Sequence, residues 1–307
     1  MLIIKNLTKT YGKFIALDHL NMEIKKGEIF GFVGPNGAGK TTTMRIIAGL
    51  LKADSGEVTV DGINARTNLK ELKNKMGYMP DFFGVYDNLK ALEYMEFYAS
   101  IYGITGDKAR RLCLELMDAV RLSDQADSYV DEMSRGMKQR LCLARSMVHD
   151  PELLILDEPA SGLDPRARVE MKEILRELHN KGKTILISSH ILPELAQLCS
   201  NIGIIEKGKM VLSGTVDEIL SVRGTASPII MKFTENQEKA LEVLKQNPLV
   251  QNIIIRDNSI SALFKGNEAE EAKILAAMIS NGALLSSFAR EGSNLEALFM
   301  QITTGEE

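Results

Sequence analysis

The stretch from Gly34 to Thr41 reads GPNGAGKT and begins at the end of the short apolar segment EIFGFVG. Its glycines let the backbone curl so that successive amide groups point inward at phosphate oxygens. Lys40 supplies a positive charge near the β- and γ-phosphates of a nucleotide, and the Thr41 hydroxyl can bind Mg²⁺. Such a loop joins a strand to the start of a helix, so it predicts an α/β fold with a nucleotide site at a strand end.

Strand-like and helix-like segments alternate over about the first 220 residues. The apolar stretches of strand length are MLIIKNL, ALDHLNMEI, GEVTVDG, ELLILD and TILISS. Helical periodicity covers residues 41–51, 166–181, 192–199 and most of 88–150. NIGIIEKGKMVLSG predicts a hairpin that turns at Lys207-Gly208. The alternation predicts a doubly wound parallel core sheet with a helical insertion at about 85–150. Together with the phosphate loop, the expected fold is a P-loop NTPase of the α/β class with N-terminal antiparallel strands.

A different pattern follows SVRGTASP, which we take as a linker at 221–228. Residues 229–307 show the order strand, helix, strand, strand, helix, strand, which is typical of a small α+β ferredoxin-like domain. We therefore expect two domains, at 1–220 and 229–307. A last helix is expected to have an apolar face made of Leu295, Leu298, Phe299 and Ile302.

Composition narrows the function classes. The formal net charge of −4 does not favour nucleic-acid binding. The three cysteines, Cys113, Cys142 and Cys199, are too few and too scattered for a disulfide framework or a zinc site. No apolar run reaches the roughly 18 residues that a membrane helix needs, so a role at a membrane would require a partner.

Carboxylates and a histidine follow two further apolar strands. LLILDEP ends in Asp157, which is suited to hold Mg²⁺, and in Glu158, which could accept a proton from an attacking water. SSH ends the next strand with His190, which could reach a γ-phosphate because parallel neighbours end at the same sheet edge. Tyr11 precedes the phosphate loop and is either an adenine-stacking residue or a turn residue.

A second helix start also suits an anion. Ser134 is a preferred N-cap residue, and apolar residues then recur at helical spacing: Met137, Leu141, Ala144 and Val148. Its first turn combines a small residue with positive charge in Arg135, Gly136 and Lys138. No phosphate loop of its own lies beside it in the sequence.

Together these motifs resemble those of ATP-binding cassette (ABC) transporter ATPases. YGKFIALD, GPNGAGKTTT, MSRGMKQR, LLILDEP, SGLD and SSH occur in the order seen in that family, over about residues 1–220. The stretch SNLEALFMQIT resembles the tail of exporter-branch members, of drug or multidrug type, that carry a small extra C-terminal domain. In this family two ATPase domains pair head to tail, and each ATP lies between one phosphate loop and the other chain's signature helix.

The resemblance implies a role for each motif. Tyr11 is similar to the adenine-stacking aromatic, Glu158 to the catalytic base and His190 to the switch histidine. Thr41 and Asp157 are similar to the magnesium-site residues. The ATP-binding positions of the chain's own loop would be Gly34, Pro35, Asn36, Gly37, Ala38, Gly39, Lys40, Thr41 and Thr42. Across the dimer, ATP would meet Ser134, Arg135, Gly136, Met137 and Asp164.

Three positions depart from the family pattern. Asp81 stands where the family has a glutamine; it reaches less far and cannot donate an amide hydrogen bond, and we include it as a metal candidate. In the signature, Arg135 replaces the first glycine and Met137 replaces glutamine. Arg135 either adds a charge-assisted contact to phosphate or ribose, or faces solvent.

The resulting expectation is the ATPase subunit of an ABC exporter that binds ATP and Mg²⁺. It would work as a homodimer, or as a heterodimer with a second ATPase, on a separate membrane permease. It would lie in the cytoplasm, peripheral to the inner face of the cell membrane. The alternative is a soluble ABC-type ATPase acting on nucleic acid or ribosomes, which the single cassette and acidic balance disfavour. Residues 228–307 could also form a small-molecule sensor or a dimerisation module.

Overall fold

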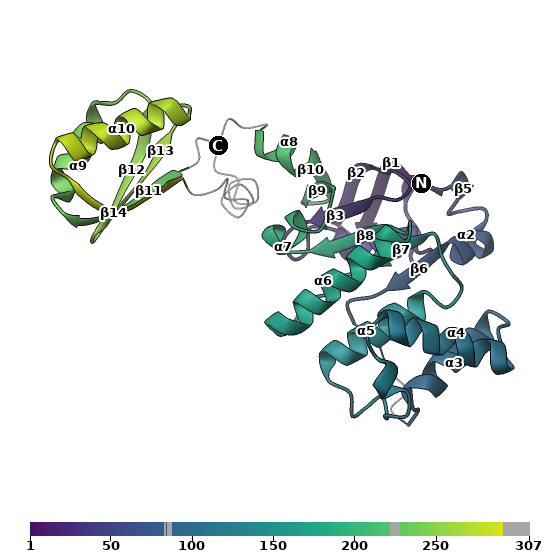
Figure 1. The fold of residues 1–307 in the computed structure, drawn as a ribbon. Coiled ribbons are helices and arrows are strands. Elements are labelled where there is room, and N and C mark those ends of the chain that lie inside the picture. Colours follow the sequence, from purple (N-terminus) through teal and green to yellow (C-terminus); the bar gives the residue numbers. More distant parts are fainter. Residues whose placement is uncertain (83, 85–87, 222–227, 291–307) are drawn as a thin grey trace. The chain divides into compact units, whose positions relative to one another are not determined.

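A computed structural model describes residues 1–82, 84, 88–221 and 228–290 of the chain. The chain divides into two compact units, Met1–Val216 and Asp217–Glu307 (Figure 1). The expected last helix and most of the expected linker lie outside the described residues. In the described part of the chain, no helix is both long enough and apolar enough to cross a membrane.

A six-stranded sheet of order β10-β9-β3-β8-β7-β6 forms the centre of the first unit. Its strands are β3 (Ile29–Val33), β6 (Met76–Met79), β7 (Leu153–Leu156), β8 (Thr184–Ser189), β9 (Asn201–Glu206) and β10 (Lys209–Thr215). All neighbouring pairs are parallel except β9 with β10, which form the predicted hairpin. Every residue of β3, β7 and β8 is buried, as expected for strands covered on both faces.

A second, antiparallel sheet of order β2-β1-β4-β5 packs beside it. Its strands are β1 (Leu2–Tyr11), β2 (Phe14–Ile24), β4 (Ser55–Val60) and β5 (Ile63–Asn64). Helix α1 (Lys40–Ile47) joins the two sheets in one apolar cluster, because its Met44 and Ile47 pack with Leu2 of β1 and Phe32 of β3. The predicted P-loop architecture with N-terminal antiparallel strands is therefore present.

Three helices gather in one lobe of this unit (Figure 1). They are α3 (Ala91–Ile101), α4 (Gly106–Ala119) and α5 (Arg135–Ser146), with a short 3₁₀ turn at Ser123–Gln125. The remaining helices of this unit are α2 (Leu69–Lys75), α6 (Pro165–Asn180) and α7 (Leu192–Ala196), and α8 (Val216–Ser221) begins at its last residue.

Two helices are shorter than the sequence predicted. Helix α1 ends at Ile47 because Gly49 adopts a left-handed backbone with φ of 67°, which stops the helix. Helix α7 ends at Ala196 because the following residues turn back toward the sheet, where the Ser200 amide donates to the carbonyl of Ile29.

The second unit has one sheet, of order β12-β13-β11-β14, with all neighbouring pairs antiparallel. Its elements are β11 (Pro228–Glu235), α9 (Gln237–Gln246), β12 (Val250–Arg256), β13 (Ser259–Phe264), α10 (Glu268–Ser280) and β14 (Leu284–Arg290). Met231, Phe264 and Met278 are fully buried members of a core between sheet and helices. The element order is the one that the sequence predicted.

Gly77 fixes how closely α5 approaches the sheet. A β-carbon on this residue of β6 would overlap the carbonyl oxygen of Ser146 in α5. We expect Gly77→Ala to lower the free energy of unfolding of the first unit by about 1–3 kcal/mol, because the added β-carbon forces α5 away from the sheet. The measurement is urea unfolding followed by circular dichroism. Gly84→Ala is the control, since a β-carbon there meets no described atom within 4 Å, and equal stability of both variants would contradict the claim.

Candidate functional site

A pocket of about 350 Å³ opens at the carboxyl ends of the parallel strands. It is lined by residues from β1, β2, the phosphate loop, α1 and the loops after β6, β7 and β8: Tyr11, Phe14, Ala16, Pro35, Asn36, Gly37, Gly39, Lys40, Thr41, Thr42, Asp81, Glu158, Ser161 and His190. Most of the predicted ATP-binding positions therefore share one pocket. Gly34 and Ala38 lie in the same loop but do not line the pocket, and both are buried.

Close packing beneath the loop explains its glycines. A β-carbon on Gly34 would lie 2.5 Å from the carbonyl oxygen of Ile205, and one on Gly39 would lie 2.7 Å from that of Ala16. Gly39 also has a φ of 113°, which residues with a β-carbon rarely adopt. The glycines thus bring the loop backbone against β9 and β2 and leave its open side to the pocket.

Lys40 is buried at the floor of the pocket. Its ammonium donates to the carbonyl oxygen of Gly34 at 2.6 Å and lies 3.5 Å from Oε1 of Glu158. Burial lowers the pKa of Lys40, while the Glu158 carboxylate acts in the opposite direction. The cation is held by groups that a nucleotide phosphate could replace.

Asp157 directly follows β7 and is 1% exposed. Its Oδ1 accepts a hydrogen bond from the Ser188 hydroxyl at 2.7 Å, whereas its Oδ2 is buried without a partner among the described residues. Burial raises the pKa of Asp157, and the nearby hydroxyls of Ser188 and Thr41 oppose that rise. One free carboxylate oxygen beside a hydroxyl fits Mg²⁺, which takes few protein ligands when a nucleotide supplies others. No cluster of three or more His, Cys, Asp or Glu side chains that could hold a metal occurs in the described ranges.

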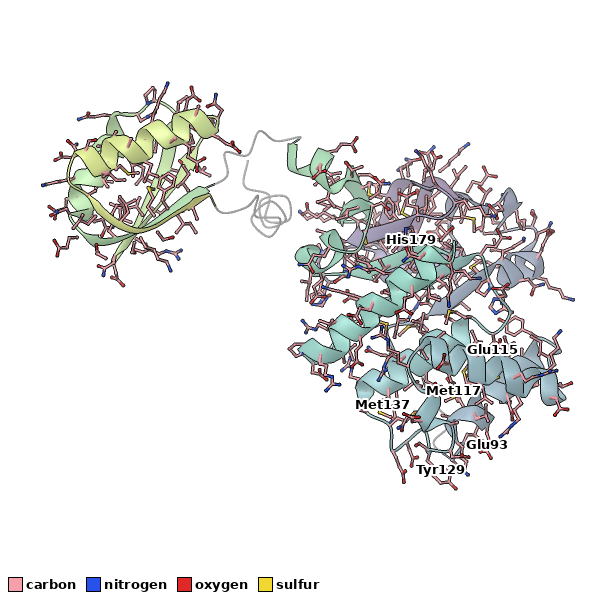
Figure 2. All side chains as sticks on the ribbon, in the orientation of Figure 1. Glu93, Glu115, Met117, Tyr129, Met137 and His179 are labelled. Carbon is pink, nitrogen blue, oxygen red and sulfur yellow. The ribbon has the colours of Figure 1, made fainter. Side chains whose placement is uncertain are left out.

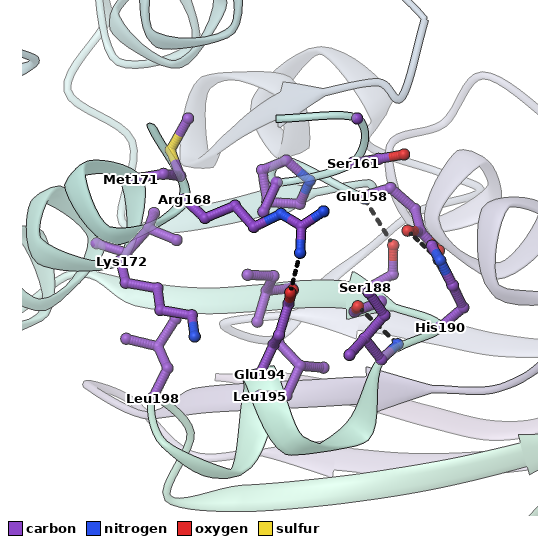
Figure 3. Close-up of a pocket in the computed structure, with 17 residues that line it drawn as sticks. Glu158, Ser161, Arg168, Met171, Lys172, Ser188, His190, Glu194, Leu195 and Leu198 are labelled. Carbon is purple, nitrogen blue, oxygen red and sulfur yellow. Dashed lines mark hydrogen bonds and ion pairs between the residues drawn. The ribbon is translucent and has the colours of Figure 1, made fainter. Parts of the chain in front are cut away.

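Glu158 and His190 form a hydrogen-bonded pair (Figure 3). Nδ1 of His190 lies 2.8 Å from Oε2 of Glu158, and the imidazole is 45% exposed while the carboxylate is 12% exposed. Glu158 has a φ of 52°, in the left-handed region. The carboxylate therefore has the Lys40 ammonium near one oxygen and the imidazole at the other, in a position to take a proton from a water in the pocket.

The signature residues begin α5 but do not line this pocket. The Ser134 hydroxyl accepts from the Met137 amide at 3.3 Å, which confirms the predicted N-cap, and Figure 2 shows Met137 on the helical lobe. Arg135 is exposed, and its guanidinium packs so closely on Gly162 that a β-carbon there would lie 2.5 Å from Cζ. Asp164 caps α6 by accepting from the amides of Arg166 and Ala167, each at 3.0 Å.

Sequence reasoning did not assign four residues that belong to the site. Phe14, Ala16 and Ser161 line the pocket, and Ser188 bonds to Asp157. Phe14 and Ala16 lie within YGKFIALD, beside Tyr11 across a strand turn, so the hairpin pairing of Tyr11 with Phe14 was the available signal. Ser161 and Ser188 flank the predicted acids and histidine but are common residue types.

Comparison with known proteins agrees with this geometry. A family model described as ABC transporter matches residues 17–161. The linearmycin resistance ATP-binding protein LnrL of Bacillus subtilis (strain 168) is 33% identical over 305 residues, which cover 99% of this chain and 98% of that protein. The bacitracin transport ATP-binding protein BcrA of Bacillus licheniformis is 35% identical over 308 residues, covering 98% and 96%.

A solved structure shares the fold of the first unit. It is a dimeric structure of the ATP-binding cassette MJ0796 in a post-hydrolysis state bound to ADP and Pi. It is 28% identical, with a TM-score of 0.65, and the match covers 70% of this chain and 99% of that chain. Motif order, pocket geometry and near full-length similarity agree: the chain belongs to the ATP-binding cassette family of transporter ATPases.

Proposed function

We propose that the chain is the ATP-hydrolysing subunit of an exporter and that its active form is a dimer of two such chains. The main observation behind the proposal is that the pocket of a single chain lacks the residues of the signature motif. Ser134, Gly136 and Asp164 do not line it, although the phosphate loop and Glu158 do. A second copy that presents its own α5 start would complete the site. The MJ0796 cassette, which is dimeric with ADP and Pi bound, supports this arrangement.

ATP would bind with its base on Tyr11 and its phosphates in the loop. Tyr11 and Phe14 are 50% and 59% exposed at the rim, which leaves their rings free to stack on adenine. The loop amides and the amino end of α1 would face the phosphates, where the helix dipole favours negative charge. Lys40 would exchange its bonds to loop carbonyls for a charge-assisted bond to phosphate.

Glu158 would act as the general base, and His190 would position it. The His190 imidazole holds one carboxylate oxygen, and the other lies 3.5 Å from the Lys40 ammonium, which lines the pocket. Thr41 and the free oxygen of Asp157 would hold Mg²⁺, with Asp81 close enough to raise the pKa of Asp157. The ion would neutralise charge on the phosphates when bound. Across the dimer, Ser134, Arg135, Gly136 and Met137 would contact the same nucleotide.

The partner we propose is a separate membrane permease, with the chain on the cytoplasmic face. The names of LnrL and BcrA, which refer to linearmycin resistance and bacitracin transport, support an exporter of drug-like compounds. Residues 1–220 would be the ATPase domain. Residues 229–307 would be an accessory domain of ferredoxin-like type, which the sheet order β12-β13-β11-β14 supports. No described feature favours nucleic acid or ribosomes as the target.

Substituting Gln for Glu158 tests the proposed base. Turnover should fall by roughly 10²–10⁴ while ATP affinity is retained, because the amide cannot accept the proton. The variant should also accumulate as an ATP-bound dimer in size-exclusion chromatography, since hydrolysis no longer separates the chains. Glu173→Gln is the control, on the exposed surface of α6 where it pairs with Arg121. Near-normal turnover of the Glu158 variant would remove Glu158 as base, and full activity of a monomer would remove the dimer.

Substituting Asn for Asp157 should stabilise the fold at pH 7 and abolish turnover. Because burial raises the pKa of this carboxyl above its unfolded value, its ionised form is destabilising at pH 7. Asp157→Asn should therefore raise the melting temperature at pH 7, while Mg²⁺-dependent turnover is lost. The gain should shrink as the pH falls and Asp157 takes up its proton. Differential scanning calorimetry between pH 5 and 8 measures this, with the exposed Asp124→Asn as control; a lower melting temperature at pH 7 would contradict it.

A further inference from the structure

Ser188 forms hydrogen bonds with both acids that follow β7, Asp157 and Glu158. It lies on β8, has no exposed surface, and its hydroxyl donates to Oδ1 of Asp157 at 2.7 Å. The hydroxyl oxygen of Ser188 also accepts a hydrogen bond from the backbone amide of Glu158 at 2.9 Å (Figure 3). The buried Ser188 hydroxyl thus donates to Asp157 and accepts from Glu158, two consecutive residues that follow the neighbouring strand β7.

The bond to the Glu158 amide supports an unfavourable backbone. Glu158 has a φ of 52°, and residues with a β-carbon avoid this region unless the surroundings hold them there. The amide points into the sheet at Ser188, so the side chain leaves on the pocket side and meets Nδ1 of His190. Without this acceptor the part-buried Glu158 amide would lose its hydrogen bond, and the turn would be held less firmly in this geometry.

The bond to Asp157 selects which oxygen is free. Ser188 occupies Oδ1, and Oδ2 has no partner among the described residues. The hydroxyl therefore fixes the rotation of the carboxylate and leaves one buried oxygen available. An oxygen held in this way is pre-organised for a ligand, because no protein bond must break before it binds.

We propose that Ser188 is a positioning residue that fixes the Asp157 carboxylate and the Glu158 backbone in place relative to each other. The inference rests on the proposed function, because it assigns the metal-site acid and the base to these two residues. A hydroxyl is required, since it can donate and accept at once. Alanine can do neither, whereas threonine can do both.

The experiment compares Ser188→Ala with Ser188→Thr in the full chain. In Ser188→Ala we expect kcat to fall by about 10², as for a small misplacement of catalytic groups, with nucleotide affinity measured without Mg²⁺ unchanged. In Ser188→Thr we expect turnover to return to within about tenfold of the wild-type rate. Ser146→Ala is the matched control, because the hydroxyl of this buried serine of α5 donates to the nearby carbonyl of Leu143 and its loss should leave turnover unchanged.

Hydrogen exchange of the Glu158 amide gives a readout that does not depend on hydrolysis. We expect protection in the wild type, Ser188→Thr and Ser146→Ala, and faster exchange in Ser188→Ala at an unchanged fold by circular dichroism. Unchanged protection or unchanged kcat in Ser188→Ala would overturn the proposal, as would a folded Ser188→Thr that is as impaired as Ser188→Ala. Failure of the proposed function is distinguishable, because then wild type and Glu158→Gln would hydrolyse ATP equally.

Discussion

The site depends on charges that the fold buries together at one edge of the parallel sheet. The Lys40 ammonium lies 3.5 Å from the Glu158 carboxylate, and the carboxylate of Asp157 is buried beside them. Burial lowers the pKa of Lys40 and raises that of Asp157, so both charges are held at a cost in stability. The apolar packing of the fully buried strands β3, β7 and β8 offsets this cost. Because these strands are parallel neighbours, the loops at their carboxyl ends lie side by side.

The start of α5 is tied to the loop that follows Glu158. The Gln139 amide donates to the carbonyl of Ser161 at 3.1 Å, and the Arg135 guanidinium packs on Gly162. Ser161 itself lines the nucleotide pocket. The loop that lines the pocket at Ser161 is therefore in direct contact with α5. Arg135 also has a contact within its own chain, which neither interpretation from the sequence included.

The sequence predicted the parts that depend on local chemistry. The loop from Gly34 to Thr41 specifies a strand before it and a helix after it. The apolar strands that precede Glu158 and His190 are parallel neighbours, so they finish at the same edge of the sheet. Helix ends were less predictable, since the left-handed turn at Gly49 stops α1 early. The role of Ser188 depends on the register of β8 against β7, which pairs residues about thirty positions apart, and no local pattern encodes that register.

The most direct measurement of the composite site is the ATPase rate of mixed dimers. A Lys40→Ala chain and a Ser134→Arg chain should each be inactive alone, because every site in either homodimer contains one defect. A one-to-one mixture contains dimers with one intact site, so the account predicts recovery of about a quarter of the wild-type rate per chain. No recovery after verified chain exchange, or full activity of the Ser134→Arg chain alone, would contradict a site shared between two copies.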